Sequence, residues 1–483
     1  MTDTDHGLVA ADPELHETES EDLLWTADQA PGTALFTDLY HVDAAYIAWK
    51  SGHNGRSTFD VYTRRAPFAG AFMLFAGLKP TLDYLRAFKY TEEDLAWLER
   101  IKGYETEFLD YLANLRFTGE ILAMEEGEIA FANEPFLRVT APFAEALLLE
   151  SGLLRTIGIS TLLASKAARI SIAAQGRAVS DFAFRRAHAP FLAARSAYIG
   201  GCDSTSFVAA AKDYDIPSAG TIPHAIVQAF PDELTAFRTV AESLPSFTLL
   251  LDTYDVPTGT DHAIQVAKEA ATSHGHTLTA VRLDSGDLAA DSRMVRDKLD
   301  AAGLEAVKVL VSGDMDEYKI EQLLAAGAPI DGFGVGGNLG VGLGTIESGT
   351  VGGVIGAVYK LAWYEGDGAT PARIKLAGGK STWPGKKMVY RIGDFDRDII
   401  ALDSEAAPTK SRALLTPWIM DGRVVRKMPD LRNIREKAMD NLTNLPDRLR
   451  ALTPDDTYPV DWSPGIEALR AEAVDAFGGE HSE

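Results

Sequence analysis

Between residues 247 and 335 the chain alternates short apolar runs with longer amphipathic ones, and this alternation constrains the fold more than any other feature. The apolar runs recur at intervals of about 22–32 residues, which is the spacing of successive βα units and favours a parallel sheet. Each intervening segment reaches a glycine at or soon after its end, as helix C-termini often do. The predicted strands are Phe247–Leu251, Leu278–Leu283, Val307–Val311 and Ile330–Val335, and the predicted helices are Asp261–Ser273, Asp287–Ala301 and Asp316–Ala326.

Charged residues and glycines gather where these predicted strands end. Arg282 and Asp284 end or follow the second strand, Asp314 follows the third, and the pair Gly336-Gly337 follows the fourth. In a barrel or parallel sheet the carboxyl ends of the strands share one face, where substrates bind. A charged turn that only caps the next helix is the competing interpretation. We keep that interpretation for Asp287 alone.

The bulk composition favours a soluble α/β enzyme. The chain has 483 residues, 46% of them hydrophobic, and a formal net charge of −24, which argues against non-specific binding to nucleic acid or to anionic membranes. Cys202 is the only cysteine, so a secreted disulfide framework is excluded and a small buried residue is expected there. Residues 1–30 contain no Lys or Arg and predict an acidic, mobile tail without a secretory signal. We find no run that is long and apolar enough to span a bilayer, and we expect a cytoplasmic protein.

The rhythm of the chain also suggests where domains begin and end. After the tail, residues 31–140 mix short strand-like and helical runs and predict an N-terminal α/β domain. Residues 141–400 contain the βα units and predict a β/α barrel as the catalytic domain. The less regular residues 401–483 predict a C-terminal extension that packs on the other domains.

Several basic residues and one histidine stand out by their surroundings. The pairs Arg64-Arg65 and Arg185-Arg186 and also Lys360 lie in or beside apolar runs, which favours paired or ligand-facing cations over solvated ones. His224 follows Gly220-Thr-Ile-Pro223 at the start of an amphipathic helix, and a proline suits that first turn. Alone, His224 is an ordinary histidine, but beside the charged strand tips it becomes a candidate nucleophile or phosphate acceptor.

Ten short stretches together resemble one family, the nicotinate phosphoribosyltransferases, and they occur in family order from about residue 34 to residue 393. The order of the ten makes the resemblance specific, where a single match would not. The matching stretches are Phe36–Tyr40, Arg65–Ala71, Ser165–Ile170, Phe184–Ala187, Tyr198–Gly201, Gly220–His224, Leu251–Asp255, Arg282–Asp287, Val311–Asp314 and Val358–Leu361.

The resemblance implies an irregular β/α barrel of the type II phosphoribosyltransferase kind, joined to an N-terminal α/β domain, in a homodimer. It implies the reaction of nicotinate with phosphoribosyl diphosphate to give nicotinate mononucleotide and diphosphate, coupled to ATP hydrolysis and dependent on Mg²⁺, in NAD biosynthesis. It assigns His224 as the histidine that ATP transiently phosphorylates and Asp284 as the carboxylate beside the sugar. Nicotinate contacts are expected from Tyr40, Thr221 and Arg282, and phosphoribosyl diphosphate contacts from Arg185, Arg186, Asp314, Gly336, Gly337 and Lys360.

The chain departs from the family pattern in three places. Gly336-Gly337-Asn338 stands where Gly-Thr-Ser is usual and looks more like the related nicotinamide phosphoribosyltransferases. Ala187-His-Ala-Pro190 replaces a more common Gln-Gly-Pro, and Phe207 replaces a usual asparagine. The glycine pair leaves a nicotinamide-using relative as one alternative. A non-catalytic protein that binds phosphoribosyl diphosphate is a second alternative, from a different functional class. The sequence leaves open which of Arg185 and Arg186 faces the site.

Overall fold

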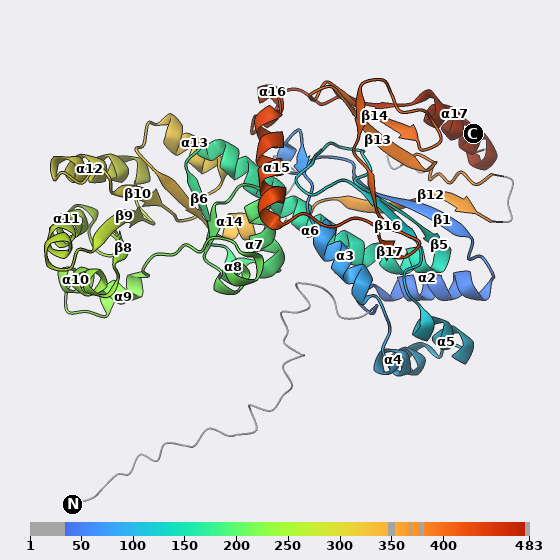
Figure 1. Cartoon of the computed structure of the whole chain (residues 1–483), viewed down its shortest axis with the longest axis horizontal. Helices are drawn as coiled ribbons and strands as arrows, with labels where there is room; N and C mark the ends of the chain where they lie inside the picture. Colours follow the sequence, from blue (N-terminus) through green and yellow to red (C-terminus); the bar gives the residue numbers. More distant parts are fainter. Residues whose placement is uncertain (1–33, 346–352, 367–369, 377–380, 479–483) are drawn as a thin grey trace, which may run out of the picture.

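The computed structural model describes residues 34–345, 353–366, 370–376 and 381–478, so the predicted acidic tail lies outside the described residues. The molecule has two halves joined by a long helix, α6 (Phe143–Ala174) (Figure 1). One half is a parallel sheet with helices around it, which we call the parallel half. The other half contains two mainly antiparallel sheets and both ends of the described chain, and we call it the body.

The parallel half confirms the βα rhythm of the sequence. Its six strands hydrogen-bond in parallel in the order β7-β6-β11-β10-β9-β8, and the four predicted strands are β8 to β11. The three predicted helices are α11, α12 and α13. The strands are β6 (Ala178–Asp181), β7 (Ser204–Thr205), β8 (Ser246–Leu250), β9 (Thr277–Leu283), β10 (Lys308–Val311) and β11 (Gly332–Val335). The helices are η3 (Phe184–Arg186), α7 (Pro190–Ile199), α8 (Val208–Tyr214), α9 (His224–Gln228), α10 (Glu233–Ser243), α11 (Val256–Ser273), α12 (Leu288–Ala301), α13 (Glu317–Ala325) and α14 (Gly337–Gly340).

Among the described residues this sheet is open. Its edge strands β7 and β8 do not pair with each other, so the sheet forms a half-barrel. A parallel bridge from Thr205 to Ser218 extends the β7 edge by one further residue. The core beneath the strands is apolar, with residues such as Val281, Val309 and Phe333 fully or almost fully buried. Because the six strands run parallel, all their C-termini lie at one edge of the sheet, which we call the rim.

The body is built on a six-stranded sheet in the order β12-β1-β5-β3-β16-β17, which faces a four-stranded sheet in the order β15-β13-β14-β18. The first sheet contains β12 (Ala357–Glu365), β1 (Arg56–Thr63), β5 (Leu137–Pro142), β3 (Glu120–Ala123), β16 (Thr416–Met420) and β17 (Arg423–Val424). The second contains β15 (Ser411–Ala413), β13 (Lys387–Ile392), β14 (Arg397–Leu402) and β18 (Val460–Trp462), and a small third sheet pairs β2 (Met73–Leu74) with β4 (Ile129–Ala130). The helices are α2 (Leu39–Lys50), η2 (Pro67–Ala69), α3 (Leu78–Ala87), α4 (Glu92–Lys102), α5 (Thr106–Asn114), α15 (Leu431–Asn444), α16 (Asp447–Arg450) and α17 (Pro464–Gly478).

The late part of the chain returns to the body. Strand β12 lies within the interval 141–400 that the sequence grouped as a barrel, but it pairs antiparallel with β1, so that Asp60 faces Lys360 across the strands. Strands β13 and β14 from the same interval form a sheet with β18. Strand β11 is the last strand of the parallel sheet in chain order, and β12, the next strand, already belongs to the body. The parallel half therefore occupies roughly residues 178–345.

Helix α6 corrects one expectation. We expected no run able to cross a membrane. By length and composition alone, however, this 32-residue helix is long and apolar enough to cross one. Two-thirds of its most apolar window is buried inside the protein, and its Lys166 and Arg169 form buried ion pairs with Glu317 of α13. It packs against α2 and α3 on one side and α7 and α13 on the other. Hydropathy alone cannot separate such a core helix from a membrane span.

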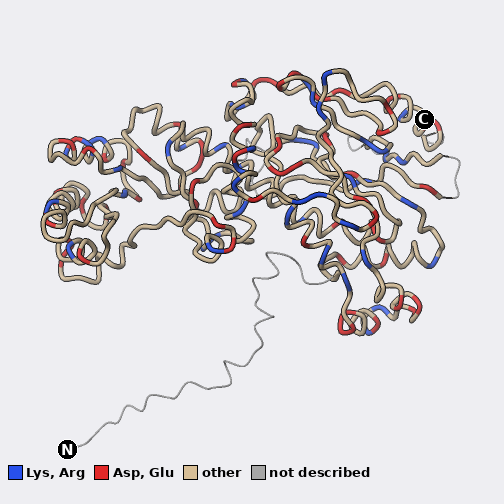
Figure 2. Tube along the Cα trace, viewed as in Figure 1, with Lys and Arg blue, Asp and Glu red and all other residues tan. Residues whose placement is uncertain are grey.

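Charge is distributed over both halves. Lys and Arg alternate with Asp and Glu along the parallel half and the body alike (Figure 2). Cys202 is buried as expected, and burial raises the pKa of its thiol well above the usual value. Charged residues of both signs occur on each half, so any anion-binding site must come from local groups.

Candidate active site

Arg282, at the end of β9, is the centre of a polar network on the rim of the parallel half. Its Nη1 donates to Asp284 Oδ1 and to Ser312 Oγ, each at 2.9 Å, and its Nη2 donates to the Ile222 carbonyl at 3.2 Å. Burial lowers the pKa of the guanidinium, and Asp284 opposes that effect. Its buried Nε has no hydrogen-bond partner among the described residues. The network therefore holds the guanidinium in place without using all of its donors.

Asp252, which follows β8, supports the same network from the side. Its Oδ2 accepts the Asp284 backbone N–H at 2.9 Å and the Ser285 hydroxyl at 2.6 Å. The other oxygen, Oδ1, is buried and has no partner in the described parts of the chain. Gly313 approaches the Asp284 carbonyl so closely that a Cβ would lie 2.0 Å from it, and its φ of +89° also favours glycine. These contacts hold the loops after β8, β9 and β10 against one another.

A cavity of about 540 Å³ opens beside Arg282 and brings several predicted residues together. Its volume falls within the range of small-molecule sites. Thr221 and Arg185 line it together with Arg282, and the charge of Arg185 acts on Arg282. Phe184 forms an aromatic part of the wall and stacks on Phe207 at 4.1 Å between ring centroids. Two cations and an aromatic wall suit a flat, anionic ligand.

Arg186 takes a different position from its neighbour Arg185. A Cβ added at Gly337 would lie 2.9 Å from Arg186 Cδ, and one at Gly336 would lie 3.7 Å from Arg186 Nη1. The Arg186 side chain therefore lies over the glycine pair, while Arg185 faces the cavity. Gly337 begins the four-residue helix α14, which the sequence did not indicate. A bare backbone beside an arginine is favourable for a phosphate.

Asp314 lies in the loop that follows β10, next to the glycine pair. Its backbone is left-handed, with φ +47°, a conformation that aspartate tolerates better than most residues. Asn338 Nδ2 donates to the carbonyls of Asp314 and Met315 at 3.2 Å each and so ties the loops after β10 and β11 together. The predicted residues Asp314, Gly336 and Gly337 are therefore neighbours.

His224 is the first residue of α9, directly after the turn that contains Thr221. Its Nδ1 lies 3.1 Å from Thr253 Oγ1, in the loop after β8. If Nδ1 is occupied in this way, Nε2 is the ring nitrogen that remains for a substrate. Since Thr253 follows Asp252, the histidine joins the same rim as Arg282.

Tyr40 and Lys360 lie elsewhere. Tyr40 is in α2 and Lys360 in β12, and both elements are at the far end of the molecule from β8, β9 and β10 (Figure 1). The Tyr40 side chain is 60% exposed and its ring lies 3.9 Å from that of His41, centroid to centroid. Burial, helped by the charge of Glu150, raises the pKa of Tyr40, and the charge of Lys360 opposes the rise that burial causes in the pKa of Glu150. The structure therefore divides the predicted residues into a rim group and a body group.

Sequence reasoning missed three polar residues of the rim, Asp252, Thr253 and Ser312. Asp252 and Ser312 each directly follow a predicted strand, which was the available signal. Asp287 caps α12, since its side chain accepts the Ala290 N–H at 3.1 Å, as predicted. Within the described ranges no group of three or more His, Cys, Asp or Glu side chains could hold a metal ion by itself.

Two family descriptions match the chain. The model for the nicotinate phosphoribosyltransferase N-terminal domain matches residues 35–158, and the model for the C-terminal domain matches residues 401–470. Nicotinate phosphoribosyltransferase pncB2 of Mycobacterium tuberculosis is 41% identical over 437 residues, covering 88% of this chain and 91% of the relative. Nicotinate phosphoribosyltransferase of Bacillus subtilis is 38% identical over 463 residues, covering 89% and 93%.

Solved structures agree with the sequence relatives. The chain is similar to human nicotinic acid phosphoribosyltransferase with a TM-score of 0.78 and 27% identity, covering 90% of this chain and 99% of the human one. It is also similar to a nicotinate-nucleotide pyrophosphorylase from Pyrococcus furiosus, with a TM-score of 0.65 and 26% identity, covering 85% and 95%. The likeness spans the parallel half and the body together.

Proposed function

The chain belongs to the nicotinate phosphoribosyltransferase family, a family of NAD biosynthesis, and from this premise we propose how its own residues perform the reaction. The names of the relatives support a transfer of phosphoribose to nicotinate. In the proposed reaction nicotinate and phosphoribosyl diphosphate would give nicotinate mononucleotide and diphosphate, with ATP hydrolysed alongside. The observation that best supports this proposal is the buried, incompletely paired Arg282 guanidinium beside a cavity that a second arginine also lines. Two cations there match the carboxylate of nicotinate and would disfavour a cationic ligand.

Arg282 and Arg185 would bind the nicotinate carboxylate. Guanidinium groups bind carboxylates through charged, often bidentate hydrogen bonds. Asp284 and Ser312 hold the Arg282 guanidinium before the substrate arrives, so little ordering remains to be done on binding. Thr221 lines the same cavity and would fix the ring. The ring nitrogen is then oriented towards the sugar, an effect that raises the local concentration of the nucleophile.

Asp284 would stabilise the sugar as the bond from ribose C1 to the diphosphate oxygen breaks. The ribose gains positive charge in that transition state, and a carboxylate already fixed in place needs no reorganisation to meet it. Arg186 and the backbone of Gly336-Gly337 would bind phosphate, since the arginine lies over the glycine pair. Mg²⁺ fits this rim as an ion held by substrate phosphates and one or two carboxylates, for which Asp284 and Asp314 are the candidates. When bound, it would neutralise charge on the departing diphosphate.

His224 would couple ATP to the transfer. Thr253 holds Nδ1, which leaves Nε2 to take the γ-phosphoryl group as ADP leaves. Water would then cleave the phosphohistidine after the nucleotide has formed, releasing phosphate and returning the neutral ring. The position of His224 on the same rim as Arg282 supports this role, because a charge placed there can act on the diphosphate site.

Tyr40 and Lys360 would reach the site from a second copy of the chain. The family resemblance assigns both to substrate, whereas within one chain α2 and β12 lie at the opposite end from β8, β9 and β10 (Figure 1). In an antiparallel homodimer with two-fold symmetry the body of each copy would meet the rim of the other, and two identical sites would form. We further propose that the half-barrel is an irregular β/α barrel of the type II phosphoribosyltransferase kind. We expect the dimer to work in the cytoplasm, independently of nucleic acid and membranes.

Base preference with and without ATP tests the proposed function. We expect turnover of nicotinate, stimulated by ATP, with nicotinamide used at least about 100-fold less well, because a neutral amide gains little from two arginines. Arg282→Ala should reduce turnover of the acid more than that of the amide. Arg293→Ala, on the exposed face of α12, is the matched control and should change neither. Equal use of both bases would favour the nicotinamide alternative suggested by Gly336-Gly337-Asn338, and ligand binding without turnover would favour a non-catalytic protein.

A further inference from the structure

A second cavity lies in the body, between β1 and β12 of one sheet and β13 and β18 of the other. Its volume is about 260 Å³, just below the usual range of small-molecule sites. Asn133 and Ser381 also line it and are exposed, so the cavity opens to the surface. We call it the tryptophan cavity, and the residues that matter for its chemistry are Asp60, Tyr62, Lys360, Trp383, Lys387 and Trp462.

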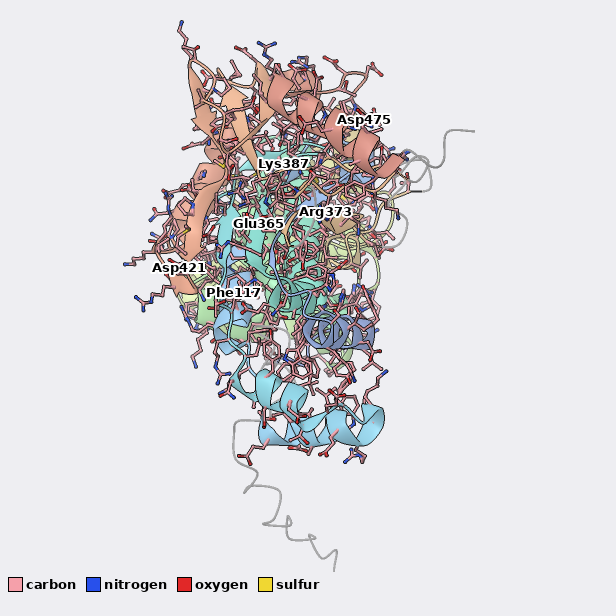
Figure 3. All side chains as sticks on the ribbon, turned by 90° about the vertical axis from the view of Figure 1, so that its right-hand side faces the viewer. Phe117, Glu365, Arg373, Lys387, Asp421 and Asp475 are labelled. Carbon is pink, nitrogen blue, oxygen red and sulfur yellow. The ribbon has the colours of Figure 1, made fainter. Side chains whose placement is uncertain are left out.

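The floor of the tryptophan cavity contains an incompletely paired carboxylate. Asp60 is 2% exposed, and its Oδ2 accepts from Lys387 Nζ at 2.7 Å. Lys387, labelled in Figure 3, also donates to the Gly385 carbonyl at 3.2 Å. The second oxygen of Asp60, Oδ1, is buried and has no hydrogen-bond partner in the described ranges. A buried carboxylate oxygen is unfavourable unless a donor meets it, so the cavity presents a strong acceptor.

The remaining charge around the tryptophan cavity is positive. Asp60 and Lys387 cancel each other, while Arg64 and Lys360 also line the cavity and form no ion pair with any described carboxylate. Lys360 is the cross-strand neighbour of Asp60, which places it directly beside the acceptor. Two cations that form no close ion pair with a described carboxylate, beside a desolvated acceptor, suit a ligand with an anionic group at one end and hydroxyl or N–H donors nearby.

Aromatic rings form another part of the wall. Trp383 and Trp462 stack with centroids 4.0 Å apart and planes inclined by 10°, and Arg470 lies over Trp383 at 4.7 Å. Tyr62 adds a third ring, and burial raises the pKa of its phenol, so it stays neutral. Flat rings of this kind provide stacking surfaces for heterocyclic bases.

We propose that the tryptophan cavity binds a mononucleotide of the class that the enzyme makes, with its base on the tryptophans, its ribose hydroxyls donating to Asp60 and its phosphate on Arg64 and Lys360. The identity of the ligand as the product rests on the proposed function, whereas the mononucleotide class rests on the cavity alone. Since Lys360 also belongs to the body group of predicted substrate contacts, an occupied cavity would withdraw that lysine from phosphoribosyl diphosphate. Binding of the product in this cavity would therefore slow further formation of the product.

Calorimetric titration of the full-length Arg282→Ala protein with nicotinate mononucleotide tests this proposal. That background weakens binding at the rim, so we expect one remaining site per chain. Trp462→Leu should lower its affinity by about tenfold or more, because stacking of a base contributes about 1–3 kcal/mol. The double variant Asp60→Asn/Lys387→Met, which removes both buried charges together, should do the same. Trp97→Leu, on α4 away from the cavity, is the matched control and should bind normally.

Two further ligands test whether the cavity accepts a different base and whether it requires a base at all. Adenosine monophosphate should bind within about tenfold of nicotinate mononucleotide, since stacking tolerates different bases. Ribose 5-phosphate should bind at least about tenfold more weakly, because it lacks a ring. Equal binding of ribose 5-phosphate, unchanged affinity in both cavity variants, or no binding to Arg282→Ala protein would each overturn the proposal, the last meaning that water alone meets Asp60. If the wild-type chain failed to use nicotinate while the cavity still bound mononucleotides, only the proposed function would fail.

Discussion

Arg282 on the rim is mostly buried and Arg391 in the body is fully buried, and the surroundings of the two guanidinium groups differ in kind. Arg391 donates from Nε and Nη2 to the two oxygens of Asp398, at 3.0 and 2.7 Å, and from Nη1 to Glu128 at 3.0 Å. Three aromatic rings surround it. Among the described residues Arg282 has one carboxylate partner, Asp284, whose side chain is 35% exposed, and its Nε has no hydrogen-bond partner. The body arginine is saturated by the protein, and the rim arginine is not.

The fully paired Arg391 stabilises the fold, whereas the incompletely paired Arg282 can still bind a ligand. In the body the Asp398 contacts outweigh burial and raise the pKa of Arg391, whereas at the rim burial prevails and lowers the pKa of Arg282. A saturated pair leaves nothing for a substrate, while an unsaturated one has a stability cost that substrate can offset. Substitutions at the two places should therefore change different measurements.

The largest expected effect is on catalysis at the rim. Arg282→Ala should reduce kcat/KM for nicotinate by about 100- to 1,000-fold, since losing a buried charged contact to the carboxylate costs about 3–4 kcal/mol. The melting temperature should stay within about 4 °C of wild type. Arg282→Lys keeps the charge without the planar fork and should lie between the two. A large fall in melting temperature with normal kcat/KM would reverse the comparison.

The next effect is on stability in the body. Arg391→Met should lower the free energy of unfolding by about 3–5 kcal/mol, because Asp398 and Glu128 are left buried without that cation. Chemical unfolding followed by circular dichroism measures the loss. Arg426→Met removes an exposed arginine paired with Glu125 and should cost less than about 1 kcal/mol. Similar losses from the two substitutions would show that the Arg391 network does not stabilise the body.

A smaller effect concerns ATP coupling. His224→Ala should abolish the stimulation of nicotinate turnover by ATP, a loss of about tenfold in the presence of ATP, while ATP-independent turnover persists. Thr253→Val removes the hydroxyl that faces Nδ1 and should weaken the stimulation without abolishing it. Steady-state rates with and without ATP distinguish the two variants. Full ATP stimulation in His224→Ala protein would remove the histidine from the proposed mechanism.

The smallest effect is a pH dependence of stability in the body. Burial, together with the facing Asp398, raises the pKa of Glu134 well above its usual value of 4.5. The folded state then binds more protons than the unfolded state above about pH 4.5, so the free energy of unfolding falls as pH rises towards the folded pKa. Glu134→Gln cannot lose a proton and should flatten this fall, so the variant should lose less stability than wild type between pH 5 and pH 8. Parallel pH profiles for the variant and wild type would contradict the assignment.

Much of the parallel half could be predicted from the sequence, because its strands and helices repeat locally. Arg282 and Asp284 were placed at one rim since parallel strands share their carboxyl ends, and the cap at Asp287 follows from its position before a helix. The partner of Arg282 on the next strand, Ser312, was not predicted as a site residue. A small polar residue gives no periodic signal, and its role depends on the register of β9 and β10.

The body could be predicted far less well, because its contacts join distant parts of the chain. Strand β12 pairs with β1 some 300 residues earlier, and Asp60 meets Lys387 across a similar separation. No local pattern encodes such pairings. The same reason explains why Tyr40 and Lys360, matched one by one to a family, gave no warning that they lie apart from the rim.

We propose that each active site combines the rim of one copy with the body of another, and mixing two inactive variants tests this arrangement most directly. In a mixed dimer of Arg282→Ala and Lys360→Ala chains, the rim of the Lys360→Ala copy meets the intact body of its partner, so one of two sites is restored. Random association would make half of the dimers mixed. We expect the separate variants to be inactive and the co-refolded mixture to recover about a quarter of wild-type activity, since one site in four is complete. Activity no higher than the sum of the separate variants would contradict the claim.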